Sequence, residues 1–131
     1  RSTLFPYTTL FRSPYRGLGR FVRTDKRAFP GRAACLAAVG AQPSRQLTLL
    51  RIETDSVDPA GGEPVLADGR AIARLTSGAH SYTFNVGLGM AYVPTGISTA
   101  AKLEVEILGQ PYPATALAEP PYDPSGARLR C

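Results

Sequence analysis

Residues 102–108 read Lys102-Leu103-Glu104-Val105-Glu106-Ile107-Leu108, a run in which charged and apolar side chains alternate. Successive side chains of an extended strand point to opposite faces, so the alternation predicts a strand with one buried and one wet face. Gly109-Gln110 then supplies a turn into a further run, residues 112–117. This part of the chain is therefore predicted to be β-structure.

Similar short runs, bounded by turn residues, recur upstream. Asp68-Gly69 offers the positive φ of a tight hairpin, whereas Ser77-Gly78 is expected to break the chain. The predicted strands are residues 47–52, 65–66, 70–76, 87–93, 102–108 and 112–117. About six short strands with frequent turns favour a mainly β fold, namely a small antiparallel six-stranded barrel over residues 46–131, with a sandwich as the alternative.

Residues 29–39 are predicted to form a short helix before the barrel. Pro30 suits a first helical turn, where a missing N–H costs nothing, and the alanines that follow are strong helix formers. Gly40 is expected to end the helix. The helix lies in a connecting segment, residues 14–45, in which Arg32 is expected to tie the helix to the barrel through a nearby carboxylate.

Basic residues gather ahead of the predicted helix. They are Arg16, Arg20, Arg23, Lys26, Arg27 and Arg32. Fifteen Lys and Arg against ten Asp and Glu give the 131-residue chain a net charge of +5. Such a cluster can meet phosphates, but a solvated or interdomain face is its commoner role. We therefore predict no nucleic-acid partner.

The first thirteen residues differ in character from the rest of the chain. Residues 3–13 resemble the conceptual translation of a sequencing-library adapter, so residues 1–13 are expected to be an artefactual or disordered segment. Without Arg1 and Arg12, thirteen basic residues remain against ten acidic ones, a charge of +3. The remaining chain is then expected to be a piece of a larger protein whose true N-terminus lies upstream.

Residue spacing argues against several classes of site. Gly17-Leu18-Gly19 and Gly87-Leu88-Gly89 both lack the third glycine of a dinucleotide-binding turn. A structural zinc site needs four Cys or His ligands, and the chain offers Cys35, Cys131 and His80. The longest apolar stretch, residues 33–39, is far shorter than the roughly 20 residues of a membrane-spanning helix. We predict no metal site and no membrane partner.

Candidate catalytic groups are few. His80 is the single histidine, and without an oxyanion-hole motif near it we interpret it as a partly exposed histidine in a loop, residues 77–81. Glu104 and Glu106 share one strand face, which is more often a solvated surface than an acid/base pair. Two cysteines favour free thiols in a reducing compartment, so a cytoplasmic location is expected. No catalytic residue is predicted.

Seven segments follow one another in a recognisable order and spacing. They are residues 25–34, 61–65, 68–70, 75–78, 90–94, 105–109 and 119–130. Together they resemble the glycine-cleavage aminomethyltransferase family over nearly all of residues 15–130. The last segment, which contains Tyr122-Asp123-Pro124-Ser125-Gly126, is most similar to the dimethylglycine and sarcosine dehydrogenase branch, where a flavin-binding oxidase domain is fused to a folate-binding aminomethyltransferase domain.

The resemblance implies a C-terminal barrel from a folate-dependent, flavin-linked dehydrogenase. In that branch an N-methylated glycine is oxidised at FAD, and the one-carbon unit passes to tetrahydrofolate. The flavin domain and most pterin-binding residues lie upstream, so the fragment alone is expected to be inactive and to have the upstream domains of its own polypeptide as partners. The alternatives are a fragment of a stand-alone glycine-cleavage aminomethyltransferase and a non-catalytic β-barrel binding module with a basic arm.

Any folate contact that this chain retains is implied for the stretch from Glu63 to Leu66 and for Tyr82. A carboxylate such as Glu63 can accept hydrogen bonds from the donor edge of a pterin, although an ordinary loop carboxylate is the alternative. The sequence departs from the family pattern at Ala79-His80, at Asn85-Val86 and at Pro30. Contacts made by the loop of the first two departures are therefore not carried over.

Overall fold

The computed structural model describes residues 23, 25–40, 43–54, 56–97 and 102–130. The adapter-like segment 1–13, Arg16, Arg20 and Cys131 lie outside the described residues. The chain divides into two compact units, Arg1–Leu47 and Thr48–Cys131. Each unit is described below by itself.

In the first unit, helix α2 spans Arg32–Gly40 and carries the free thiol of Cys35. The predicted start at residue 29 is wrong, because Pro30 and Gly31 form a turn in which Gly31 has a φ of +84°. A residue in that left-handed conformation cannot continue a right-handed helix. The Cys35 N–H instead donates to the Gly31 carbonyl at 2.9 Å, at the start of the helix.

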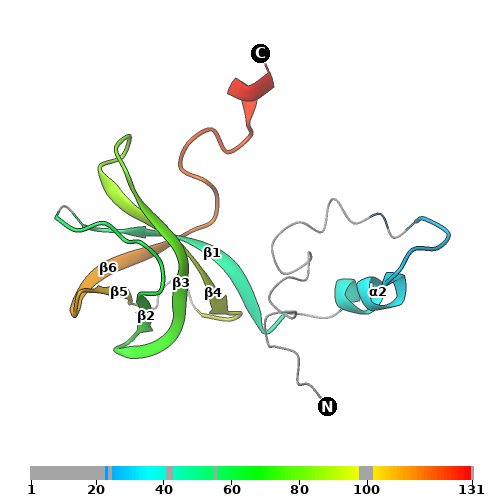
Figure 1. The fold of residues 1–131 in the computed structure, drawn as a ribbon, viewed down its shortest axis with the longest axis horizontal. Helices are drawn as coiled ribbons and strands as arrows, with labels where there is room; N and C mark the ends of the chain where they lie inside the picture. The colour runs from blue at the N-terminus through cyan, green and yellow to red at the C-terminus, as the bar shows by residue number, and fades with distance from the viewer. Residues whose placement is uncertain (1–22, 24, 41–42, 55, 98–101, 131) are drawn as a thin grey trace. The chain divides into compact units, whose positions relative to one another are not determined.

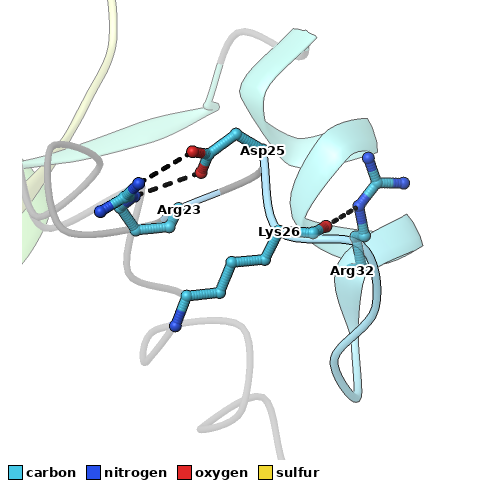
Figure 2. Close-up of polar contacts among 4 residues, drawn as sticks. All are labelled: Arg23, Asp25, Lys26 and Arg32. Atoms are coloured by element: carbon cyan, nitrogen blue, oxygen red, sulfur yellow. Dashed lines mark hydrogen bonds and ion pairs between the residues drawn. The ribbon is translucent and has the colours of Figure 1, made fainter.

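The basic residues of this unit make local contacts (Figure 2). The Arg23 guanidinium donates two hydrogen bonds to the Asp25 carboxylate, at 2.9 and 3.2 Å. Arg32 Nε donates to the carbonyl oxygen of Lys26 at 3.0 Å, and this bond closes a loop inside the unit. The expected tie from Arg32 to the barrel stays a prediction. Because the Arg23–Asp25 pair is exposed, it adds little stability, but it occupies the guanidinium.

The second unit is a closed six-stranded antiparallel barrel, as predicted (Figure 1). The strands are β1 (Arg45–Ile52), β2 (Pro64–Ala67), β3 (Arg70–Ser81), β4 (Val86–Pro94), β5 (Leu103–Ile107) and β6 (Gln110–Leu117). Around the barrel they follow the order β1-β4-β3-β2-β5-β6. The short 3-10 helix η3 (Ala127–Arg130) ends the described chain.

Strand β5 shows the burial that its alternation predicts. Leu103, Val105 and Ile107 are buried, while Glu104 and Glu106 between them are half-buried on the other face. The buried residues join one core with members from every strand of the barrel. That core contains Leu50, Ile52, Val65, Leu75, Ala91, Val93, Leu103, Val105, Ile107 and Ala114.

Two turns are tighter than ordinary loops. Asp68-Gly69 has φ values of +49° and +75°, the left-handed pair of a two-residue hairpin, as expected from the sequence. The β5–β6 turn has the same character but is formed by Leu108 and Gly109, at +52° and +79°. The predicted turn at Gly109-Gln110 is thus one residue too late, and Leu108 lies 87% exposed at its tip.

Strand β3, the long curved strand in green, does not break at Ser77-Gly78 (Figure 1). It continues to Ser81, with a register shift between Leu75 and Ser77, and Gly78 pairs with Gly89 of β4. The predicted break is wrong because this glycine serves close packing rather than a turn. A Cβ atom on Gly78 would lie 2.7 Å from the Cβ and the carbonyl oxygen of Pro59.

Pro59 belongs to the connection between β1 and β2, which are not neighbours in the barrel. The connection passes β4 and β3, and Pro59 is fully buried against them. A Cβ on Gly87 would meet Thr54 Cγ2 at 2.8 Å and Pro59 at 3.2 Å. Thr54 holds the start of this connection, since its hydroxyl donates to the Val57 carbonyl and accepts from the Val57 N–H, at 2.6 and 3.3 Å. Glycines on β3 and β4 therefore leave the space that Pro59 fills.

We predict that Gly78→Ala lowers the free energy of unfolding by about 2 kcal/mol or more, because the new methyl group meets buried backbone that cannot move aside. Gly89→Ala is the matched control. Its Cβ would approach the side-chain ends of Leu75 and Ile52, which can shift more easily than backbone, so the expected loss is smaller, about 1 kcal/mol. Urea unfolding of both variants measures the difference, and equal stabilities would show that Pro59 is not held in this way.

Candidate functional site

Glu63 closes the connection just before β2. Its carboxylate oxygens accept hydrogen bonds from the backbone N–H groups of Ala60 and Gly61, at 2.8 and 2.7 Å. Its own carbonyl accepts from the Leu75 N–H at 2.9 Å. Burial raises the pKa of the Glu63 carboxyl, but hydrogen bonds from the backbone N–H groups of Ala60, Glu63 and Gly61 outweigh it and leave the pKa below its ordinary value. The carboxylate therefore holds the loop as an anion.

Leu66 lies on β2, where it pairs with Glu104 of β5 and Ala71 of β3. Its neighbour Val65 is fully buried in the core, so Leu66 points to the outer face of the barrel and is half-buried there. The side chain offers apolar contact and no hydrogen-bonding group.

Tyr82 stands at the tip of the β3–β4 hairpin and is 89% exposed. Its ring meets the His80 imidazole edge-to-face, with centroids 5.0 Å apart and planes at 66°. His80 Nδ1 lies 3.4 Å from an Asp58 carboxylate oxygen. His80 is partly exposed as expected, but its predicted place in a loop is wrong, since it lies on β3 opposite Gly87. These two contacts hold the imidazole between a carboxylate and a phenol ring.

The three residues implied as folate contacts come from different segments of the barrel: Glu63 precedes β2, Leu66 lies on β2, and Tyr82 lies in the β3–β4 turn. Glu63 lies beside Leu75 on β3, whereas Tyr82 follows seven residues farther along the same chain. At about 3.3 Å per strand residue, this separation is roughly 20 Å along the path of the chain. The role of each residue in folate binding stays a prediction.

Sequence reasoning missed two hollows on the barrel surface. One has a volume of about 210 Å³ and is lined by Leu49, Ser77, Gly78, Ala79, Leu88, Gly89 and Met90. The other has a volume of about 240 Å³ and is lined by Arg51, Phe84, Val86, Leu88, Leu117 and Pro121. The signal was present in β4, because its residues are apolar at successive positions and not only at alternate ones.

Two other features, a metal site and a membrane-spanning helix, are absent from the described part of the chain. No group of three His, Cys, Asp or Glu side chains is placed to hold a metal ion there. Within the same described ranges, no helix is both long and apolar enough to cross a membrane.

A family model described as the glycine cleavage T-protein C-terminal barrel domain matches residues 45–123. The chain belongs to this family. The match covers all six strands of the barrel, so the resemblance drawn from the ordered segments is confirmed. The structure agrees at the level of fold with a glycine cleavage system aminomethyltransferase T from Bartonella henselae. The TM-score is 0.70 at 22% identity, covering 81% of this chain and 30% of that one.

The relatives of this T-protein barrel are enzymes. Rat dimethylglycine dehydrogenase, a mitochondrial protein by its name, is 39% identical over 118 residues, which cover 87% of this chain and 14% of the rat protein. An aminomethyltransferase from Synechococcus sp. is 36% identical over 108 residues, 81% of this chain and 29% of that protein. The chain thus spans about one seventh of the dehydrogenase and under a third of the aminomethyltransferase.

We predict that Glu63→Gln lowers the free energy of unfolding at pH 7 by about 1 kcal/mol, because the amide replaces an anion that accepts two backbone hydrogen bonds. The stabilisation by the wild-type anion is present above the ordinary pKa of 4.5 and is lost as the pH falls through the lowered pKa of the folded state. The gap between variant and wild type therefore narrows at pH 3.

Urea unfolding at both pH values measures this gap, with Glu119→Gln on the exposed tail as the control. A gap that stays constant from pH 7 to pH 3 would mean that the charge of Glu63 does not hold the loop.

Proposed function

We propose that the chain is the C-terminal barrel of a flavin-linked demethylating dehydrogenase of the dimethylglycine and sarcosine type. The observation that carries this proposal is the 39% identity to rat dimethylglycine dehydrogenase over 87% of the chain, within a relative that is about seven times longer than the matched part. The Tyr122-Asp123-Pro124-Ser125-Gly126 tail supports the same branch.

In this proposal the parent enzyme oxidises an N-methylated glycine and transfers the released one-carbon unit. FAD, bound to a domain outside this chain, would accept the electron pair, and tetrahydrofolate would accept the one-carbon unit. The barrel supplies no group for the oxidation. Apart from the implied folate contacts, its described residues have structural roles, and the fragment alone is inactive.

Of the implied folate contacts, Tyr82 is the most available. Its ring is exposed at a hairpin tip, and its orientation is supported by His80. Both carboxylate oxygens of Glu63 already accept backbone hydrogen bonds, which favours the alternative of a structural loop carboxylate. Leu66 would add only apolar contact. Most of the folate site would then belong to upstream domains.

A stand-alone aminomethyltransferase is the second candidate, favoured by the 36% identity to the Synechococcus protein. A non-catalytic binding module with a basic arm has less support, because the Arg23 guanidinium is already engaged by Asp25. The cytoplasmic location stays a prediction, and the mitochondrial names of the rat, mouse and human dehydrogenases point to an organelle for those relatives.

We predict that the isolated chain shows no measurable binding of tetrahydrofolate by isothermal titration calorimetry, because most pterin-binding residues are expected to lie upstream of it. A chimera in which this chain replaces the matched segment of rat dimethylglycine dehydrogenase is expected to bind it. The control is the rat protein lacking that segment. Micromolar binding to the isolated chain would contradict the proposal, and so would a flavin-loaded chimera that does not bind.

A further inference from the structure

Strand β4 is apolar on both of its faces. Gly89, Ala91 and Val93 face the core, so Val86, Leu88 and Met90 point outward. Met90 and Phe84 of the adjoining hairpin are 37% and 39% exposed. In a barrel strand that faces only water, the outward positions are ordinarily polar. The outer face of β4 therefore has the composition of a surface that is covered.

The outward residues of β4 form one continuous surface with their neighbours. Leu88 lines both hollows and so joins them. We call this surface the apolar wall, and its members are Leu49, Ala79, Phe84, Val86, Leu88, Met90, Leu117 and Pro121. It draws on β1, β3, β4 and β6 as well as on the hairpin and the tail, so it is a property of the folded barrel and not of one segment.

The charge of the wall favours an apolar partner. Among the residues that line the two hollows, Arg51 carries the charge, and its Nε lies 3.1 Å from the Glu53 carboxylate. The Glu53 carboxylate therefore neutralises the charge of the Arg51 guanidinium. An anionic or phosphorylated ligand would have to compete with that carboxylate.

The size of the hollows favours protein side chains over a cofactor. Their volumes of about 210 and 240 Å³ lie below the roughly 300 Å³ at which small-molecule sites usually begin. Each is large enough for an apolar side chain presented by another surface. Two adjacent hollows joined by Leu88 suit a partner that inserts two neighbouring side chains.

We propose that the apolar wall is the surface on which this barrel docks against the preceding domain of its own polypeptide. This inference rests on the proposed function, in which the chain belongs to a longer enzyme. It is supported by the relatives, whose matched segments make up 14% of the dehydrogenase and 29% of the aminomethyltransferase. A covalent tether gives the docked surfaces a high effective concentration, so an interface of modest area suffices.

The test uses the chimera with rat dimethylglycine dehydrogenase and the double variant Leu88→Glu/Met90→Glu. Two carboxylates on the wall cannot be buried without partners, so the docked state is disfavoured. We expect limited proteolysis to cut the junction before the barrel at least about tenfold faster in the double variant than in the unmodified chimera. Equal cutting rates for the two chimeras would overturn the proposal.

Leu108→Glu is the matched control, because it exchanges an exposed leucine for an acid at the β5–β6 turn, away from the wall. This chimera is expected to be cut as slowly as the unmodified one. Thermal unfolding of the isolated chain with Leu88→Glu/Met90→Glu shows whether the barrel still folds. If it does not, Ala79→Glu replaces the pair, since Ala79 is an exposed member of the wall on β3.

Two further outcomes separate this inference from its alternatives. A tight dimer of the isolated chain that Leu88→Glu/Met90→Glu dissociates in sedimentation would assign the wall to a second copy and overturn the proposal. Binding of tetrahydrofolate to the unmodified chimera is measured separately. If the junction is protected but the chimera does not bind tetrahydrofolate, the proposed function is refuted and the docking surface stands. If the chimera binds tetrahydrofolate but its junction is not protected, the docking surface is refuted and the proposed function stands.

Discussion

The burial of Pro59 against Gly78 and Gly87 is the constraint on which the rest of the barrel depends. On one side of the closed barrel β4 and β3 lie between β1 and β2, and the connection from β1 to β2 passes these two strands. It can lie against them only where no Cβ atom intervenes, and the two glycines provide that space. Thr54 fixes the start of the connection and Glu63 its end.

The packing of Pro59 also determines which surfaces of the barrel remain available to other molecules. The space beside β3 and β4 is occupied by the protein's own chain, and Glu63 uses its charge to hold that chain in place. What the barrel offers to other molecules is therefore on its outer surface. The exposed Tyr82 and the apolar wall are two such features.

The sequence predicted the barrel well where burial alternates and poorly where glycine has a packing role. The alternation in β5 and the Asp68-Gly69 hairpin follow from local rules and appear as expected. Ser77-Gly78 was interpreted as a break because the proline that needs the glycine lies 19 residues earlier, and no local rule connects them. The apolar wall was missed for a similar reason, since an apolar strand does not reveal which of its two faces is the core.

We propose that this barrel is the C-terminal part of a longer folate-dependent, flavin-linked enzyme. Reading the genomic DNA upstream of the codon for Tyr15 tests it most directly. We expect an open reading frame that continues into a folate-binding half and, farther upstream, a flavin-binding segment with the Gly-x-Gly-x-x-Gly pattern. A start codon immediately before Tyr15, with an unrelated gene upstream, would contradict it.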